Sequence, residues 1–145
     1  MARDLFPESE KKSIEQAIKD AEKMTSGEIQ VHIERKCKGN PLDRASSLFA
    51  EFEMHKTKLR NGVLFYVAMD SKQFAILGDA GINSKTPDGF WDEIKLAVIE
   101  EFKTGGYSTG LIKGILMAGD ALKTHFPYQK DDINELPDEI SFGNN

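Results

Sequence analysis

Apolar residues recur at two different spacings along the chain, and these spacings divide it into helices and strands. In four stretches an apolar residue returns every three or four positions, which is typical of an amphipathic helix. In three shorter stretches apolar residues alternate with polar ones or follow one another without a break, which is typical of strands. The predicted helices span residues 8–24, 41–59, 88–102 and 108–126, and the predicted strands span residues 28–35, 63–69 and 73–77.

The three strands differ in their expected burial and pairing. Residues 28–35 alternate apolar and polar side chains, which predicts one buried face, whereas residues 63–69 are nearly all apolar, which predicts a central strand covered on both faces. Only residues 70–72 separate the second strand from the third, so these two should form an antiparallel hairpin. A helix separates the first strand from the second, so that pair should be parallel with a right-handed crossover.

This order of elements predicts the fold class. Helices on both faces of a small mixed sheet give an α/β fold, a three-layer α/β/α sandwich. Residues 1–127 should form this single domain, and residues 128–145 should form a C-terminal tail. In such sheets ligands bind where loops converge beyond the ends of strands. The turn before the second strand and the loop after the third should meet at one end of the sheet.

Composition and charge exclude several classes of function. The 145-residue chain has a formal net charge of −5, whereas a general nucleic-acid binder needs a basic surface, so no nucleic-acid partner is expected. The longest apolar run, Val63–Met69, is far shorter than the ~20 residues of a membrane span. The amino-terminal residues lack the apolar core of a secretory signal, and one cysteine cannot form an internal disulfide. We therefore expect a soluble cytoplasmic protein without a membrane partner.

The residues after the third strand carry the strongest chemical signal. Asp79 lies between Gly78 and the pair Ala80-Gly81, so a carboxylate stands directly beyond a buried strand on backbone that can bend sharply. Hard cations such as Ca²⁺ and Mg²⁺ prefer carboxylate and carbonyl oxygens, which this loop offers, and Asp88 follows nearby. The alternative is a plain turn followed by a capped helix.

Polar residues from two other segments are expected at the same end. Arg60 and Asn61 precede the second strand and can supply a guanidinium and an amide to an anion, while Glu28 opens the first strand, parallel to the second. Trp91 follows the loop and can wall a cleft. The alternatives are a helix stop at residues 60–62, a salt bridge that pins the sheet edge, and a core position for the tryptophan.

Common catalytic and metal-binding signatures are missing. The sequence contains neither a Gly-x-x-x-x-Gly-Lys-Ser/Thr phosphate loop nor a Gly-x-Gly-x-x-Gly fingerprint. One cysteine and three separated histidines do not form a typical closed zinc site. We interpret His32, His55, His125 and Cys37 as ordinary surface or half-buried residues and assign no catalytic residue.

Taken together, these segments resemble the TPM domain family. The matching residues are Ser26-Gly27-Glu28, Arg60-Asn61-Gly62-Val63-Leu64, Ile76-Leu77-Gly78-Asp79-Ala80-Gly81-Ile82, Trp91 and the Gly-rich helix that ends at Phe126-Pro127. The resemblance covers residues 8–127. It implies an α/β/α sandwich with a polar cleft that binds divalent cations. The residues that it implicates are Glu28, Asp79 and Asp88 as cation ligands, and Arg60, Asn61 and Trp91 as anion-binding or cleft-lining residues.

The known roles of the family do not transfer directly. Plant relatives in the thylakoid lumen are associated with photosystem II repair and acid phosphatase activity, and a nematode relative is a membrane-tethered regulator of an acetylcholine receptor. This chain differs from much of the family because we find no signal peptide or transmembrane tail in it.

Three hypotheses of function follow. The first is a domain that binds Ca²⁺ or Mg²⁺, with Asp79 as principal ligand and Glu28 or Asp88 assisting. The second is a metal-assisted phosphomonoesterase of low efficiency, acting on a phosphorylated small molecule, with Arg60 stabilising charge on the phosphoryl oxygens. The third is a non-enzymatic module that docks an unknown protein; a tail packed on its own domain would count against it.

Overall fold

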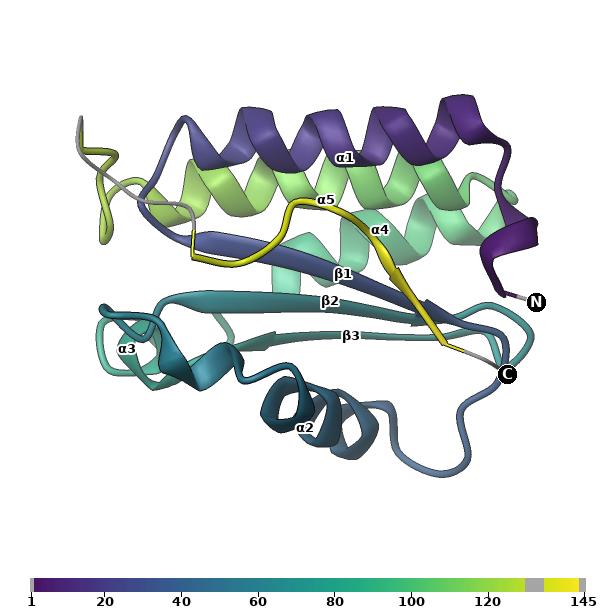
Figure 1. Ribbon diagram of the computed structural model, residues 1–145, viewed down its shortest axis with the longest axis horizontal. Helices are drawn as coiled ribbons and strands as arrows, with labels where there is room; N and C mark the ends of the chain where they lie inside the picture. Colours follow the sequence, from purple (N-terminus) through teal and green to yellow (C-terminus); the bar gives the residue numbers. More distant parts are fainter. Residues whose placement is uncertain (1, 130–134, 144–145) are drawn as a thin grey trace.

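A four-stranded mixed sheet forms the middle layer of the computed structural model, which describes residues 2–129 and 135–143 (Figure 1). The strands lie in the order β3-β2-β1-β4. β1 pairs in parallel with β2 and β4, and β2 pairs antiparallel with β3, so the predicted crossover pair and hairpin are confirmed. The strands are β1 (Glu28–Glu34), β2 (Gly62–Ala68), β3 (Gln73–Gly78) and β4 (Ser141–Phe142).

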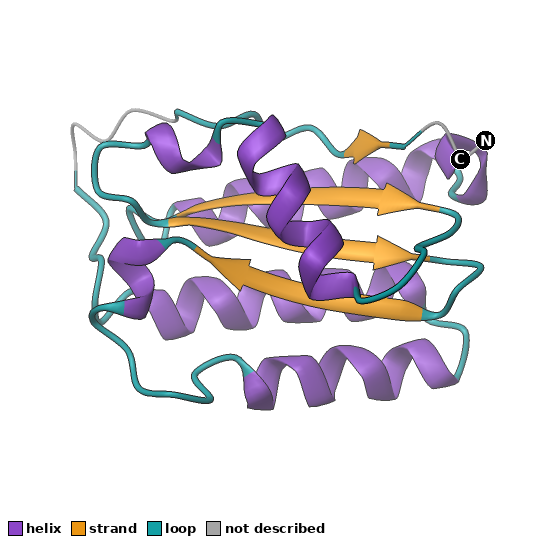
Figure 2. Cartoon of the chain, turned by 90° about the horizontal axis from the view of Figure 1, so that it is seen from below, coloured by secondary structure: helices purple, strands orange, loops and turns teal. Residues whose placement is uncertain are grey.

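Helices cover both faces of the sheet, which confirms the predicted sandwich. One face carries α1 (Glu8–Glu22), α4 (Asp92–Lys103) and α5 (Tyr107–Leu122). The opposite face carries α2 (Pro41–Glu51), which crosses the strands in Figure 2. Short elements complete the chain: η1 (Ala2–Leu5), η2 (Met54–Lys56) and α3 (Ala80–Asn83).

The sheet separates two apolar clusters. The larger one packs α1, α4 and α5 onto the sheet, and the smaller one packs α2 onto the other face. All seven residues of β1 are buried, including the polar side chains of Gln30, His32 and Glu34. The expectation that β1 has one exposed polar face was therefore wrong, because α2 and the C-terminal segment cover that face.

α1 and α5 end two and four residues earlier than predicted, at Glu22 and Leu122, and two further helix boundaries differ for local backbone reasons. α2 ends at Glu51, well before residue 59, because Glu53 adopts a left-handed φ of 55° that a helix cannot continue through. α4 begins at Asp92 because Gly89 has a φ of 78°, so Asp88 does not cap a helix and lies exposed in a turn. Helical periodicity detected both helices but could not show these breaks.

The C-terminal segment packs on its own domain. Leu136 and Ile140 are buried, and the backbone amide of Ile140 donates to Glu15 Oε2 at 3.1 Å. β4 then pairs with the edge of β1. Ile133, another apolar residue of the predicted tail, lies outside the described residues. This packing of residues 135–143 counts against the tail as a docking segment for a partner protein.

Among the described residues, no helix is both long enough and apolar enough to cross a membrane.

Candidate functional site

Asp79 and Arg60 form a paired site at the end of the sheet where β3 ends and β2 begins. Arg60 Nε donates to Asp79 Oδ2 at 2.8 Å, and Arg60 Nη2 donates to Asp79 Oδ1 at 2.9 Å. Asp79 is also the N-cap of α3, because its Oδ1 accepts the amide of Ala80 at 2.7 Å. The carboxylate is only 6% exposed, whereas the arginine side chain is 49% exposed. The topology therefore predicted this juxtaposition correctly.

Close contact between two backbone segments fixes the pair. The amide of Gly81 donates to the carbonyl of Arg60 at 2.8 Å, and the amide of Asp79 donates to that of Gly62 at 3.0 Å. A Cβ at Gly81 would lie 2.2 Å from the carbonyl oxygen of Leu59 and 2.5 Å from that of Arg60. Only glycine fits this position, so residue 81 allows α3 to lie against the turn that carries Arg60.

The other four predicted site residues make their contacts elsewhere and do not contact the pair of Asp79 and Arg60 in the hydrogen bonds described here. Asn61 lies beside β1, where its carbonyl accepts the amide of Glu28 at 3.2 Å. The Glu28 carboxylate points elsewhere and accepts the backbone amides of Glu135 and Leu136. Asp88 is exposed, and Trp91 packs in the core against Gly78. Within residues 2–129 and 135–143, no three His, Cys, Asp or Glu side chains converge to hold a metal ion.

Two carboxyl groups lie near the amino end of β1: that of Glu28, which is buried, and that of Glu22, which is half-buried. Burial raises the pKa of Glu22 to about 9, and a hydrogen bond with Asp138 adds to this effect. Burial raises the pKa of Glu28 to about 7, although the amides of Leu136 and Glu135 oppose the shift. Both groups therefore favour the protonated form in the folded protein.

These shifts predict that stability decreases as pH rises. A carboxyl group whose folded pKa lies above its unfolded value stabilises the fold fully below the unfolded pKa, near 4.5, and that contribution is lost as pH rises through 7 and 9. Glu22→Gln cannot ionise, so we expect its free energy of unfolding relative to wild type to increase by about 4 kcal/mol between pH 5 and pH 8, that is, about 1.4 kcal/mol for each pH unit between the two pKa values. Urea unfolding at both pH values measures this. The control Glu93→Gln, at an exposed position of α4, should change the free energy of unfolding by the same amount at both pH values. If Glu22→Gln also has the same effect at both pH values, the raised pKa of Glu22 is contradicted.

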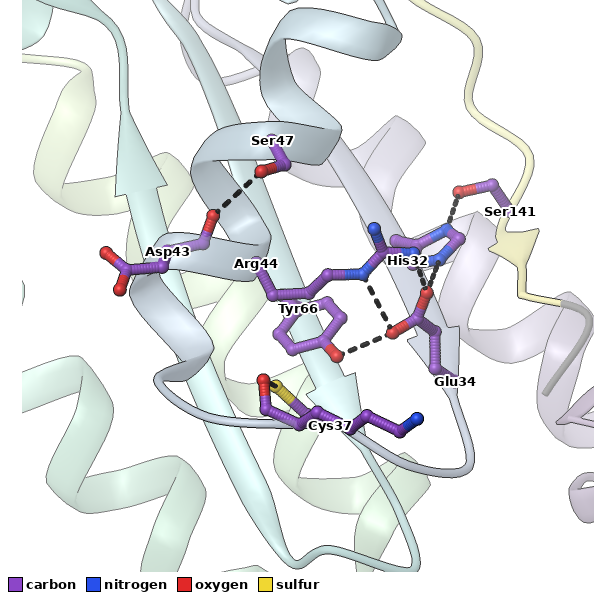
Figure 3. A network of polar contacts seen from close by, with 9 residues as sticks. His32, Glu34, Cys37, Asp43, Arg44, Ser47, Tyr66 and Ser141 are labelled. Carbon is purple, nitrogen blue, oxygen red and sulfur yellow. Dashed lines mark hydrogen bonds and ion pairs between the residues drawn. The ribbon is translucent and has the colours of Figure 1, made fainter.

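A second polar cluster lies under α2 near the carboxyl end of β1 (Figure 3). Glu34, which is 1% exposed, binds Arg44 through both carboxylate oxygens and accepts the hydroxyl of Tyr66 at 2.6 Å. His32 Nε2 lies 3.2 Å from Glu34 Oε1, and His32 Nδ1 lies 2.7 Å from Ser141 Oγ. An open cavity of about 480 Å³ is lined by four of these polar residues, His32, Glu34, Arg44 and Ser141, and by apolar residues that include Phe52 and Phe142.

The protonation states in this cluster follow from its contacts. Burial alone would raise the pKa of Glu34, but hydrogen bonds from Arg44, Tyr66 and His32 outweigh it and hold the pKa below its usual value. Burial lowers the pKa of His32, although Glu34 opposes this. The cluster therefore contains an ionised Glu34, a charged Arg44 and a neutral His32.

Sequence reasoning classed His32 as ordinary and did not consider Glu34, Arg44, Tyr66 or Ser141. One signal was present, since Gln30, His32 and Glu34 place polar groups at every second position of a strand followed by a helix. Their burial depends on which face that helix covers, and alternation alone does not show this.

The fold and these clusters place the chain in the class of α/β sandwich domains with a polar, carboxylate-bearing edge. A model of the TPM domain matches residues 2–121. The chain therefore belongs to the TPM domain family, as the resemblance predicted.

Solved structures agree with this assignment. The chain is similar to the BA42 protein of the psychrophilic bacterium Bizionia argentinensis, an NMR structure, with 49% identity over 95% of each chain and a TM-score of 0.90. It is also similar in fold to the N-terminal domain of a protein from P. gingivalis, with 20% identity over 86% of this chain and 82% of that chain and a TM-score of 0.70. The N-terminal domain of cg2496 from Corynebacterium glutamicum matches with 15% identity over 80% of this chain and 73% of that chain and a TM-score of 0.65. No curated protein matches the chain significantly.

Proposed function

We propose that this TPM domain binds a divalent cation, Ca²⁺ or Mg²⁺, at Asp79, and that the cation displaces the guanidinium of Arg60. The observation that carries the proposal is the asymmetry of this ion pair. The carboxylate is buried and fixed by α3, whereas the arginine that neutralises it is half exposed to solvent. A cation arriving from solvent therefore competes with a half-exposed partner for a carboxylate that α3 holds in place.

Displacing Arg60 would not leave a buried charge uncompensated. The cation would neutralise the Asp79 carboxylate in place of the arginine, and water would solvate the half-exposed guanidinium that is released. The cation would complete its coordination with water and with the carbonyl of Leu59, which lies against Gly81; the carbonyl of Arg60 already accepts the amide of Gly81. Asp88, exposed in the turn after α3, is the second carboxylate candidate. Glu28 is a weaker candidate, because two backbone amides already bind its carboxylate.

Asp79→Asn tests the proposal. Asparagine retains an N-cap acceptor for α3 but removes the charge that a hard cation requires. We expect calcium or magnesium affinity, measured by calorimetry or by amide shifts in NMR titration, to fall at least tenfold. The control is Asp70→Asn, because Asp70 also pairs with an arginine, Arg35, at the other end of the sheet. If both variants bind as wild type does, Asp79 is not the ligand.

A phosphomonoesterase is the second candidate function, and the geometry of Arg60 favours it. A guanidinium released from Asp79 by the cation would be free to bind phosphoryl oxygens beside that cation. Hydrolysis of a phosphomonoester should then require the cation and be lost in Asp79→Asn. Activity that persists in that variant would exclude this site.

A further inference from the structure

The cavity under α2 has the arrangement of a second, independent chemical site. It lies near the carboxyl end of β1, between α2 and the paired strands β1 and β4, and open α/β sheets commonly bind ligands at this end of their strands. Glu28 and Glu34 stand at opposite ends of β1, so this cavity is about 20 Å from the amino end of the strand. Asp79, although it follows β3, lies at that amino end.

The hydrogen bonds determine which group donates at each contact. Glu34 is ionised and only accepts, so the proton of the neutral imidazole belongs on His32 Nε2, which faces the carboxylate at 3.2 Å. Nδ1 is then an acceptor, and its partner at 2.7 Å is the hydroxyl of Ser141. That hydroxyl can alternatively donate to the carbonyl of Val31, but at the longer distance of 3.3 Å.

We propose that Ser141, His32 and Glu34 form a hydrolytic triad that cleaves small uncharged acyl esters. A serine hydroxyl bonded to the bare nitrogen of a histidine, whose other nitrogen is bonded to a carboxylate, is the arrangement that activates a serine nucleophile, whatever the order along the chain. Ser141 is only partly buried and lines the cavity, so a substrate can reach it.

The cavity also indicates the class of substrate. The charges of Glu34 and Arg44 compensate each other at the floor of the cavity, and the carboxylate of Glu51 also lines it and disfavours an anion, so the cavity favours an uncharged ester. Leu48, Phe52 and Phe142 provide apolar walls for an acyl chain. Arg44 lines the same cavity and is 38% exposed, so its positive charge would stabilise the oxyanion of a tetrahedral intermediate formed there.

The reaction balances with water as the only co-reactant. Ser141 Oγ attacks the ester carbonyl carbon while its proton passes to His32 Nδ1, and Glu34 stabilises the resulting imidazolium. The carbon–oxygen bond to the alcohol then breaks, and the imidazolium returns the proton to the departing alcohol. Water attacks the acyl-Ser141 in the same way, which releases the carboxylic acid and restores the serine.

The sequence offers a matched control in a second serine. Ser108 lies in the pattern Gly106-Tyr107-Ser108-Thr109-Gly110, which resembles the nucleophile elbow of other hydrolases. It occupies the first turn of α5 and follows a helix instead of a strand, and its hydroxyl donates to Glu10 Oε1 at 2.6 Å. The geometry therefore assigns reactivity to Ser141 and not to Ser108.

The test treats the full chain, in EDTA to silence any cation site, with a fluorophosphonate probe and with p-nitrophenyl butyrate. We expect the probe to attach to Ser141, as read by peptide mass spectrometry. We expect Ser141→Ala to abolish labelling and His32→Gln to slow ester hydrolysis about 100-fold, with Ser108→Ala unchanged.

The labelling site in the wild-type protein decides the question even if a variant fails to fold. No adduct on the folded wild-type chain, or an adduct at another residue, would overturn the proposal. Ester hydrolysis that slows as the pH is lowered and His32 becomes protonated would support the proposal, since only the neutral imidazole accepts the serine proton.

Discussion

Gly81→Ala is expected to destabilise the protein by about 3 kcal/mol, near the upper end for overpacking in a rigid site. The added methyl would lie 2.2 Å from the carbonyl oxygen of Leu59 and 2.5 Å from that of Arg60, both of which are backbone atoms. The turn at residues 59–61 must then move away from α3, which breaks the hydrogen bond from Gly81 to Arg60. Thermal or urea unfolding measures the loss.

Gly62→Ala is the matched control for this effect. Gly62 lies next to the same turn, but a Cβ there meets its nearest neighbours, Leu136 Cδ1 and the carbonyl of Met54, at an ordinary contact distance of 3.4 Å. We expect its free energy of unfolding to change by less than about 1 kcal/mol. Equal destabilisation by both alanines would show that the contact between α3 and the turn is looser than described.

Glu34→Ala is expected to cost about 3 kcal/mol of stability, because it removes the acceptor shared by three buried or half-buried donors. Tyr66 would retain a buried hydroxyl without its partner, and Arg44 would lose the carboxylate that it binds with two nitrogens. Arg44 is 38% exposed, so water compensates for part of its loss, which places the effect at the lower end of the range for broken buried pairs.

Glu51→Ala is the matched control, because it removes a carboxylate from the rim of the same cavity without touching the hydrogen bonds of Glu34. Glu51 lines the same cavity but is exposed. Its removal should change the free energy of unfolding by no more than about 0.5 kcal/mol. A comparison of the two variants by urea unfolding at pH 7 tests the account, and a small effect of Glu34→Ala would contradict the central role of that carboxylate in packing α2 onto the sheet.

The fold could be predicted from the sequence because its main elements have strong periodicity and its connections are short. The hairpin of β2 and β3 and the crossover through α2 follow from lengths alone. α3 was missed because four residues show no period, and β4 was missed because two residues in a polar tail pair with a strand more than a hundred positions away. Both missed elements carry site residues or hold them in place.

The sequence predicted those parts of the candidate site whose position follows from the order of the strands. It did not predict the contacts that depend on the direction in which a side chain points. Strand order placed Arg60 and Asp79 at one end of the sheet, and their ion pair confirms this. Glu28 was placed correctly along β1, but its carboxylate binds the amides of Glu135 and Leu136, a contact that local sequence does not encode. His32 and Glu34 were overlooked because a strand's alternation does not show which face a distant segment will bury.

The central claim is that a divalent cation replaces Arg60 at the carboxylate of Asp79. The most direct measurement follows the side-chain Nε–H signal of Arg60 by NMR during titration with calcium and then magnesium, up to about 10 mM to include weak sites. The account predicts that this signal, held by Asp79 Oδ2 in the metal-free protein, moves to the position of a solvated arginine as the amides of residues 79–82 shift with the same midpoint. An Arg60 signal that stays in place throughout the titration would contradict it.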